Sequence, residues 1–142
     1  MKISAKTEYA CIAMMELASN HGSGEPVRIR KIAQQHGIPA HFLVQILLQL
    51  KRAGLVASTR GSAGGYQLVQ SPAEITLATV MAVVEGPDEP IKSNAADTSL
   101  AARVLLQSWQ EVADVEHDML ESITFADLVD QASARHEAMY YI

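Results

Sequence analysis

Two short amphipathic segments separated by a very short turn constrain the fold most. Residues 27–37 (VRIRKIAQQHG) have the apolar spacing of a helix and end in Gly37. Residues 39–54 (PAHFLVQILLQLKRAG) begin with Pro39, which suits a helix start. Their inward face would be Leu43, Ile46, Leu47 and Leu50. Two helices joined in this way predict a helix-turn-helix unit, although helical hairpins of this length are also common without any DNA role.

A glycine-rich segment follows at once. Residues 55–59 and 66–69 favour strands, and the sequence RGSAGG between them predicts a hairpin. A phosphate-binding loop is the alternative, but the segment lacks the Gly-Lys-Ser/Thr ending of a P-loop. Strands on both sides also leave no helix N-terminus to face a phosphate. A helix-turn-helix followed by a hairpin is the order of a winged helix.

The rest of the chain is predicted to be helical. A first helix starts after Ser4 and stops at Gly22, and its wide apolar stripe indicates burial on most sides. Ser71-x-x-Glu74 could form a capping box, and the stronger helical pattern runs from Thr76 to Gly86. Residues 87–98 are predicted to form a loop, and a long helix is predicted from Ser99 to about Ser122. A last helix, capped by Thr124-x-x-Asp127, is predicted to end near His136.

These elements predict a mainly α fold with a small β-hairpin. Residues 1–86 would form a winged helix-turn-helix DNA-binding domain, and residues 87–98 a loop. Residues 99–142 would form a long dimerisation helix and a C-terminal helix. The long helix carries a narrow seam that steps by four and three residues: Leu105, Trp109, Val112, Glu116, Met119 and Ile123. We favour pairing between two subunits over packing of this seam on the chain's own core.

The two halves of the chain differ in charge. The whole chain carries a net charge of −5, but residues 1–70 carry +5 and residues 71–142 carry −10. This asymmetry suggests that the first half binds a polyanion, although two solvated faces of one globule would give the same count. No secretory signal or run of about 18 apolar residues is present. We therefore expect a cytoplasmic protein without a membrane partner.

Catalysis is not expected. The five histidines are scattered at positions 21, 36, 41, 117 and 136, and His117 alone has acids at helical spacing, which suits a surface ion pair. The single cysteine, Cys11, lies within an apolar helix face and suits an inert buried thiol. No nucleophile, base and orienting group can be identified together. We expect no metal or catalytic site.

A winged helix would place the second helix of the helix-turn-helix in the major groove. The expected DNA contacts on that helix are Ala40, His41, Val44, Gln45 and Arg52. The Gln45 amide could form a bidentate pair with adenine, and the Val44 side chain could contact a thymine methyl group. The alternative is that Val44 and Leu48 are buried. Arg60, with Gly61 and Tyr66, would form the wing and enter a minor groove. The expected phosphate contacts near the N-terminus are Lys2, Ser4, Lys6 and Thr7.

The segments MKISAKTEYA, IAQQHGIP, LLQLKRAGLVASTRGSAGGYQL, EITLATVMAVVEG and ITFADL, in this order, resemble the Rrf-two (Rrf2) family of bacterial winged-helix regulators. The resemblance covers nearly the whole chain, and the RGxxGGY wing motif is its most specific part. It implies a homodimer built on the long helix, binding to a palindromic operator, and transcriptional repression.

The chain departs from the family at two places. Family members that hold an iron–sulfur cluster carry three cysteines and a histidine before a tryptophan like Trp109, and the equivalent positions here are Ile91, Asp97, Arg103 and Leu106. We therefore expect no iron–sulfur cluster and no other cofactor. Related recognition helices often have Leu-Glu-Gln where this chain has Leu43-Val44-Gln45, which predicts a different operator.

The function predicted from the sequence is a dimeric, sequence-specific transcriptional regulator. Its signal would be a small molecule, a regulatory protein partner, or nothing beyond its own concentration. The alternative is a winged-helix module for protein–protein interaction that uses the acidic C-terminal half and does not bind specific DNA.

Overall fold

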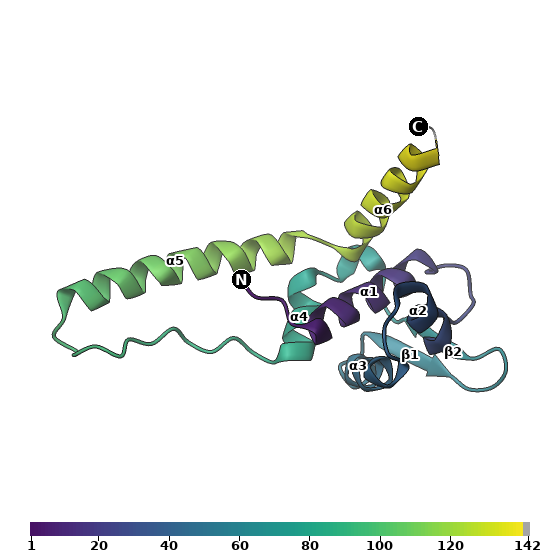
Figure 1. Ribbon diagram of the computed structural model, residues 1–142, viewed down its shortest axis with the longest axis horizontal. Helices are drawn as coiled ribbons and strands as arrows, with labels where there is room; N and C mark the ends of the chain where they lie inside the picture. The colour runs from purple at the N-terminus through teal and green to yellow at the C-terminus, as the bar shows by residue number, and fades with distance from the viewer. Residues whose placement is uncertain (141–142) are drawn as a thin grey trace.

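The computed structural model describes residues 1–140. Its elements, in chain order, are α1 (Ala5–Ser19), α2 (Ile29–His36), α3 (Ala40–Arg52), β1 (Val56–Thr59), β2 (Gly65–Leu68), the 3-10 helix η1 (Pro72–Glu74), α4 (Leu77–Glu85), α5 (Leu100–Ser122) and α6 (Phe125–Tyr140). The first four helices, the hairpin and α6 pack together. The long helix α5 projects away from them, and the loop before it runs back along its length (Figure 1).

The helix α1 lies at the centre of the packed part and contacts α2, α3, α4, α6 and β2. It begins where the Ser4 hydroxyl accepts a hydrogen bond of 3.1 Å from the Thr7 N–H. Its small and flexible apolar residues let neighbours approach on several sides, and Ala10, Ala13 and Met14 have no exposed surface. The predicted burial of this helix on most sides is confirmed.

The helix-turn-helix is formed by α2 and α3. Gly37 ends α2 with a φ of 65°, a left-handed conformation that glycine adopts without strain. Pro39 precedes α3 and acts as its N-cap residue instead of its first helical residue. The four residues predicted to face inward from α3 are all at most 1% exposed, namely Leu43, Ile46, Leu47 and Leu50.

The hairpin pairs β1 with β2 in an antiparallel register that sets Val56 opposite Leu68 and Thr59 opposite Gly65. A third segment, which the sequence analysis did not predict, extends this sheet. The Val27 N–H donates to the Tyr66 carbonyl at 2.9 Å, and the Tyr66 N–H donates to the Val27 carbonyl at 2.8 Å. The wing is therefore held on Val27, two residues before α2 begins.

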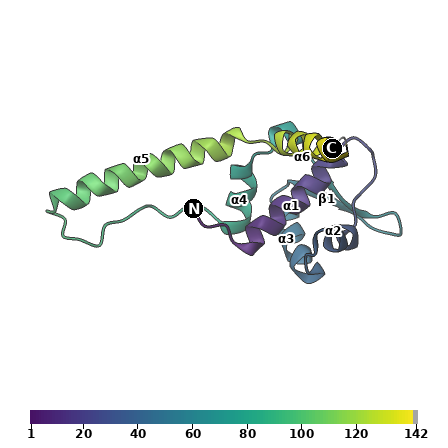
Figure 2. The same cartoon turned by 45° about the horizontal axis from the view of Figure 1, so that its top comes forward.

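The first turns of the C-terminal helix pack onto α1 and η1, and a turned view shows α6 above the end of α1 (Figure 2). A short bridge between Thr76 and Thr124 joins the starts of α4 and α6. The predicted cap is confirmed, because the Thr124 N–H donates to Asp127 and the Asp127 N–H donates to the Thr124 hydroxyl, both at 3.1 Å. Phe125 is fully buried, which anchors α6 in the core.

Several predicted boundaries differ from the structure, and α1 ends at Ser19 instead of at Gly22. Ser71 does act as a cap, with its hydroxyl accepting from the Ala73 N–H at 3.3 Å, but the segment it starts is the 3-10 helix η1. The last helix continues beyond His136 to Tyr140 because its pattern contains no glycine or proline stop. Residues 141–142 lie outside the described part of the chain.

Candidate nucleic-acid interface

The outward face of α3 is open to solvent. Five outward-facing residues of its first three turns are exposed, namely Ala40, His41, Val44, Gln45 and Leu48, while Gln49 is half-buried. Val44 is 45% exposed and Leu48 is 36% exposed, so the alternative in which they are buried does not hold. Arg52 is exposed at the end of the same helix. This face can therefore meet a partner directly.

The wing places Arg60 at its exposed tip. The Lys51 ammonium donates to the Ser58 hydroxyl at 2.7 Å, which ties β1 to the end of α3. A side chain at Gly64 would collide with the backbone of Thr59 and Arg60, because the loop folds tightly onto itself there. The glycines thus close a narrow hairpin that presents Arg60 with little bulk around it.

Three further cations lie beside the wing, and the sequence analysis did not include them. Arg28, Arg30 and Lys31 are exposed at the start of α2 and line a groove of about 450 Å³ together with Gln34 and Gln35. Within residues 1–140 none of the three forms an ion pair with a carboxylate. The first turn of α2 contains no acidic residue and no capping side chain.

This charge arrangement opposes the helix dipole, which favours anions at a helix N-terminus. Three cations within four residues at a predicted helix start were the signal that could have identified the group. Because the bridge between Val27 and Tyr66 sets Arg28 beside Gly65 at the loop end of β2, Arg28 lies next to the hairpin. Because α2 packs against α3, these cations lie on the element next to the one that carries the open face.

The start of α1 is organised differently from the expectation. Thr7 is only 2% exposed, and its hydroxyl donates to Glu85 at the end of α4. The Ser4 hydroxyl reaches the same carboxylate at 2.7 Å. The hydrogen bonds from Thr7 and then Ser4, together with the charge of Lys6, hold the pKa of the Glu85 carboxyl below its usual value. Thr7 is therefore not placed for the predicted phosphate contact.

The other residues predicted to contact DNA differ in their exposure to solvent. Lys2, Lys6 and Gly61 are exposed. Tyr66 is half-buried and packs against the core, while its backbone pairs with Val27 on one side and with Ser58 on the other. Tyr66 therefore contributes to the position of the wing.

The predicted dimer seam is largely uncovered in the single chain. The described residues of α5 include none that is buried. Leu105 is 50% exposed, Trp109 56%, Val112 64% and Met119 62%; Glu116 is also exposed, and Ile123 is half-buried at the end of the helix. Val104 and Val115 widen the exposed apolar face. The seam does not pack on the core of its own chain.

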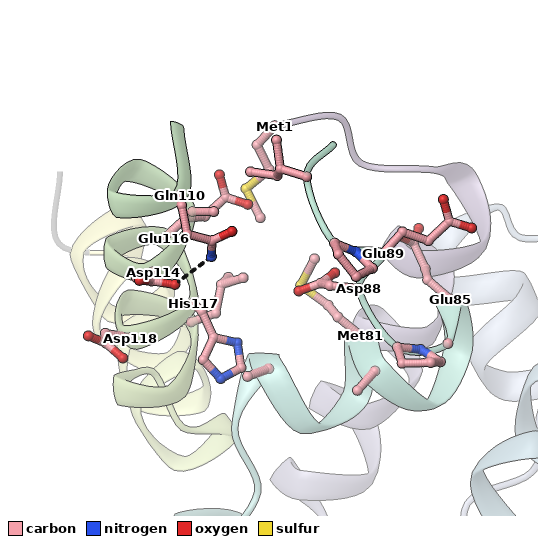
Figure 3. A pocket seen from close by; sticks show the side chains of 18 of the residues that line it. Met1, Met81, Glu85, Asp88, Glu89, Gln110, Asp114, Glu116, His117 and Asp118 are labelled. Carbon is pink, nitrogen blue, oxygen red and sulfur yellow. Dashed lines mark hydrogen bonds between the residues drawn. The ribbon is translucent and has the colours of Figure 1, made fainter. Parts of the chain in front are cut away.

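A cleft of about 1060 Å³ lies between α4, α5 and the loop that joins them (Figure 3). Carboxylates from both walls line it, including Glu85 and Asp88 on one side and Asp114 and Glu116 on the other. The Gln110 amide donates to Asp114 at 2.9 Å across one helical turn. A surface of this charge repels a polyanion, so the cleft differs chemically from the exposed cations of α2 and the wing.

The described residues show neither a catalytic group nor a metal cluster. Burial raises the pKa of the Cys11 thiol to about 11, so the thiol stays protonated at neutral pH. His117 forms an exposed ion pair with Glu121 at 3.1 Å, as its spacing suggested. Within residues 1–140 no group of three or more metal-ligating side chains is found. In that same part of the chain, no helix is both long and apolar enough to span a membrane.

A family model described as "Rrf2: Iron-dependent Transcriptional regulator" matches residues 3–131. The chain belongs to the Rrf2 family. The HTH-type transcriptional regulator CymR of Bacillus subtilis is 39% identical over 143 residues and covers 100% of both chains. The HTH-type transcriptional regulator IscR of Vibrio cholerae is 34% identical, covering 91% of this chain and 75% of its own.

Solved structures give the same assignment. The B. subtilis CymR structure aligns with a TM-score of 0.81 at 38% identity, over 92% of this chain and 98% of that chain. The structure of T. potens IscR aligns with a TM-score of 0.76 at 32% identity, over 93% and 88%. The predicted winged-helix fold is confirmed, as is the prediction of a transcriptional regulator in place of an enzyme.

The family description names iron, which cluster-binding members would hold in the loop before α5 and at the start of that helix. Ile91, Asp97, Arg103 and Leu106 stand where the cluster-binding pattern has its ligands, and none is a thiolate. In the structure, these residues line shallow pockets between the loop and the start of α5. Cys11 is on α1 and is partly buried in the packed helices. The residues present do not fit a thiolate-bound cluster.

Proposed function

We propose that this Rrf2 protein is a cytoplasmic homodimer that binds a palindromic DNA operator and represses transcription there. The observation that supports it best is the open face of α3 together with the exposed cations of α2 and the wing, none of which forms an ion pair within residues 1–140. Gln45 and its neighbours present groups for base edges, while Arg60 and the cations of α2 present groups for phosphates or a narrow groove. Lys2 and Lys6 add exposed charge at the start of α1.

The homodimer is supported by the uncovered seam on α5. Leu105, Trp109 and Val112 are each at least half exposed, and monomeric proteins rarely leave such residues together in water. A second copy of the same helix offers a matching apolar face, and a twofold pair of recognition helices would read a palindromic site. The C-terminal acidic half would then stay away from the DNA because of its charge.

We further propose that the regulator works without an iron–sulfur cluster, since the ligand positions lack thiolates. Its signal would be a small molecule, a regulatory protein partner, or its own concentration. The cleft between α4 and α5 offers room for an effector, and Glu85 in its wall contacts Ser4 and Thr7 at the start of α1. Purified protein with a stoichiometric iron–sulfur absorption band would contradict this part of the proposal.

Selection of bound duplexes from a random library, followed by fluorescence anisotropy on the enriched sequence, tests DNA binding. Arg60→Ala should lower the operator affinity by about tenfold or more, since it removes a groove contact. Arg103→Ala is the matched control, because Arg103 is an exposed arginine on α5 away from the wing. If no sequence is enriched and promoter DNA is not shifted at low salt, the protein-interaction alternative replaces the proposal.

A further inference from the structure

The exposed residues in the first three turns of α3 share one unusual property. The outward positions from Ala40 to Leu48 carry no Arg, Lys, Asp or Glu. The chemical groups exposed between Ala40 and Leu48 are one imidazole, one amide and the apolar side chains of Phe42, Val44 and Leu48. The Phe42 ring lies against the rings of Tyr9 and His41, which leaves Val44 and Leu48 as the aliphatic groups of this face. The helix becomes cationic only in its last turn, at Lys51 and Arg52.

This set of groups suits one kind of base pair. Guanine is read most often by Arg or Lys, and cytosine by a carboxylate, and neither type is available on this part of the face. A glutamine amide can pair with both N6 and N7 of adenine. In the major groove, the thymine 5-methyl is the apolar group that base edges display.

Val44 and Leu48 lie four residues apart, so they stand on the same side of α3 in successive turns. Gln45 lies between them in sequence and faces outward beside them. The two apolar side chains can therefore contact methyl groups on neighbouring base pairs, while the Gln45 amide forms hydrogen bonds with an adenine. The exposed cations, from Arg28 to Arg60, suit an anionic partner such as the phosphates of DNA and make an apolar or cationic protein partner less suited.

We propose that Val44, Gln45 and Leu48 form an A·T-specific reading surface, in which Gln45 pairs with adenine and the two apolar residues contact thymine methyl groups. This inference rests on the proposed function, because it requires that α3 enter the major groove. It adds the class of operator: each half-site carries A·T pairs at the positions that α3 reads. It also assigns Leu48 a role in specificity.

Replacing thymine by deoxyuridine tests the surface, since it removes a methyl group and leaves base pairing intact. On the duplex selected by the wild type, single substitutions at the thymines contacted by α3 should each lower the affinity by roughly fourfold, the factor expected for one buried methyl. In Val44→Ala or Leu48→Ala, one of these losses should disappear while the others remain. Val69→Ala, which alters a 57% exposed valine outside α3, should leave all of them unchanged.

The outcomes distinguish a failure of the A·T-specific reading surface from a failure of DNA binding itself. Wild-type binding with no loss at any deoxyuridine position, or a selected half-site with G·C pairs at the α3 positions, overturns the reading surface and leaves DNA binding intact. Deoxyuridine losses that persist in both alanine variants also overturn it, because the methyl groups would then be contacted by other residues. Failure to select any duplex overturns the proposed function itself.

Discussion

Replacing Gly65 by alanine should destabilise the wing far more than the same change at Gly61. A Cβ at Gly65 would lie 2.5 Å from the Val27 carbonyl oxygen and 2.7 Å from its carbon. Both are backbone atoms that cannot move without disturbing the two hydrogen bonds between Val27 and Tyr66. At Gly61 a Cβ would meet open space, although the φ of 102° is also unfavourable for alanine.

The magnitude follows from these contacts. Both variants lose about 1–3 kcal/mol through backbone strain at positive φ. Gly65→Ala also weakens two backbone hydrogen bonds, each contributing a net free energy of about 0.5–1.5 kcal/mol. The free energy of unfolding should therefore fall by about 1–3 kcal/mol more in Gly65→Ala than in Gly61→Ala. For a chain of this size, this difference lowers the melting temperature by about 3–9 °C.

Chemical and thermal denaturation of the two variants, followed by circular dichroism, measures the difference. Operator affinity should fall with stability in Gly65→Ala, because the wing carrying Arg60 loses its support on Val27. Equal stability of the two variants would refute the account of how the wing is held, since it would mean that the close approach of Gly65 to Val27 has no energetic consequence.

Other residues give further predictions. Val112→Asp should dissociate the proposed dimer, which analytical ultracentrifugation measures, and should shift the fluorescence of the single tryptophan, Trp109, to longer wavelength. A dimer of unchanged affinity would contradict the proposal that α5 forms the dimer interface. Because its folded-state pKa is lowered, Glu85 should stabilise the fold fully above its unfolded pKa of about 4.3, and this contribution should fade as the pH falls through the lower folded-state pKa. Unfolding titrations of Glu85→Gln should lack this acid-dependent part of the stability, and an unaltered pH profile would argue against the contact with Thr7. The double variant Arg30→Gln, Lys31→Gln should weaken binding to all duplexes alike, so the ratio of the affinities for operator and unrelated DNA in anisotropy assays should stay constant. A change in the preferred sequence would mean that these residues contact bases instead of phosphates.

Much of the fold follows from local patterns in the sequence. The inward face of α3, the glycine that ends α2 and the Thr124–Asp127 cap depend on short-range spacing, and each is found where the pattern predicts it. The third segment of the sheet was not predictable in this way. Val27 is a single paired residue, and its pairing with Tyr66 depends on how the hairpin folds back in three dimensions.

The candidate site was predicted less completely than the fold. Residues on α3 were placed correctly because helical periodicity separates inward from outward positions. Thr7 was not, since its burial depends on Glu85, which is 78 residues away in the sequence. The sequence analysis did not include the group from Arg28 to Lys31, because its place next to the hairpin and the lack of carboxylate partners within residues 1–140 appear only in the folded chain.

The salt dependence of operator affinity tests the central claim most directly. Each phosphate neutralised by a cation releases counterions, so the logarithm of the association constant should fall linearly with the logarithm of the salt concentration, with a slope of about −0.9 per phosphate contacted. Exposed Arg28, Arg30, Lys31 and Arg60 on each subunit predict a steep slope for the wild type. The Arg60→Ala dimer should retain its fold and show a shallower slope. A flat salt response in the wild type would contradict DNA recognition through this surface.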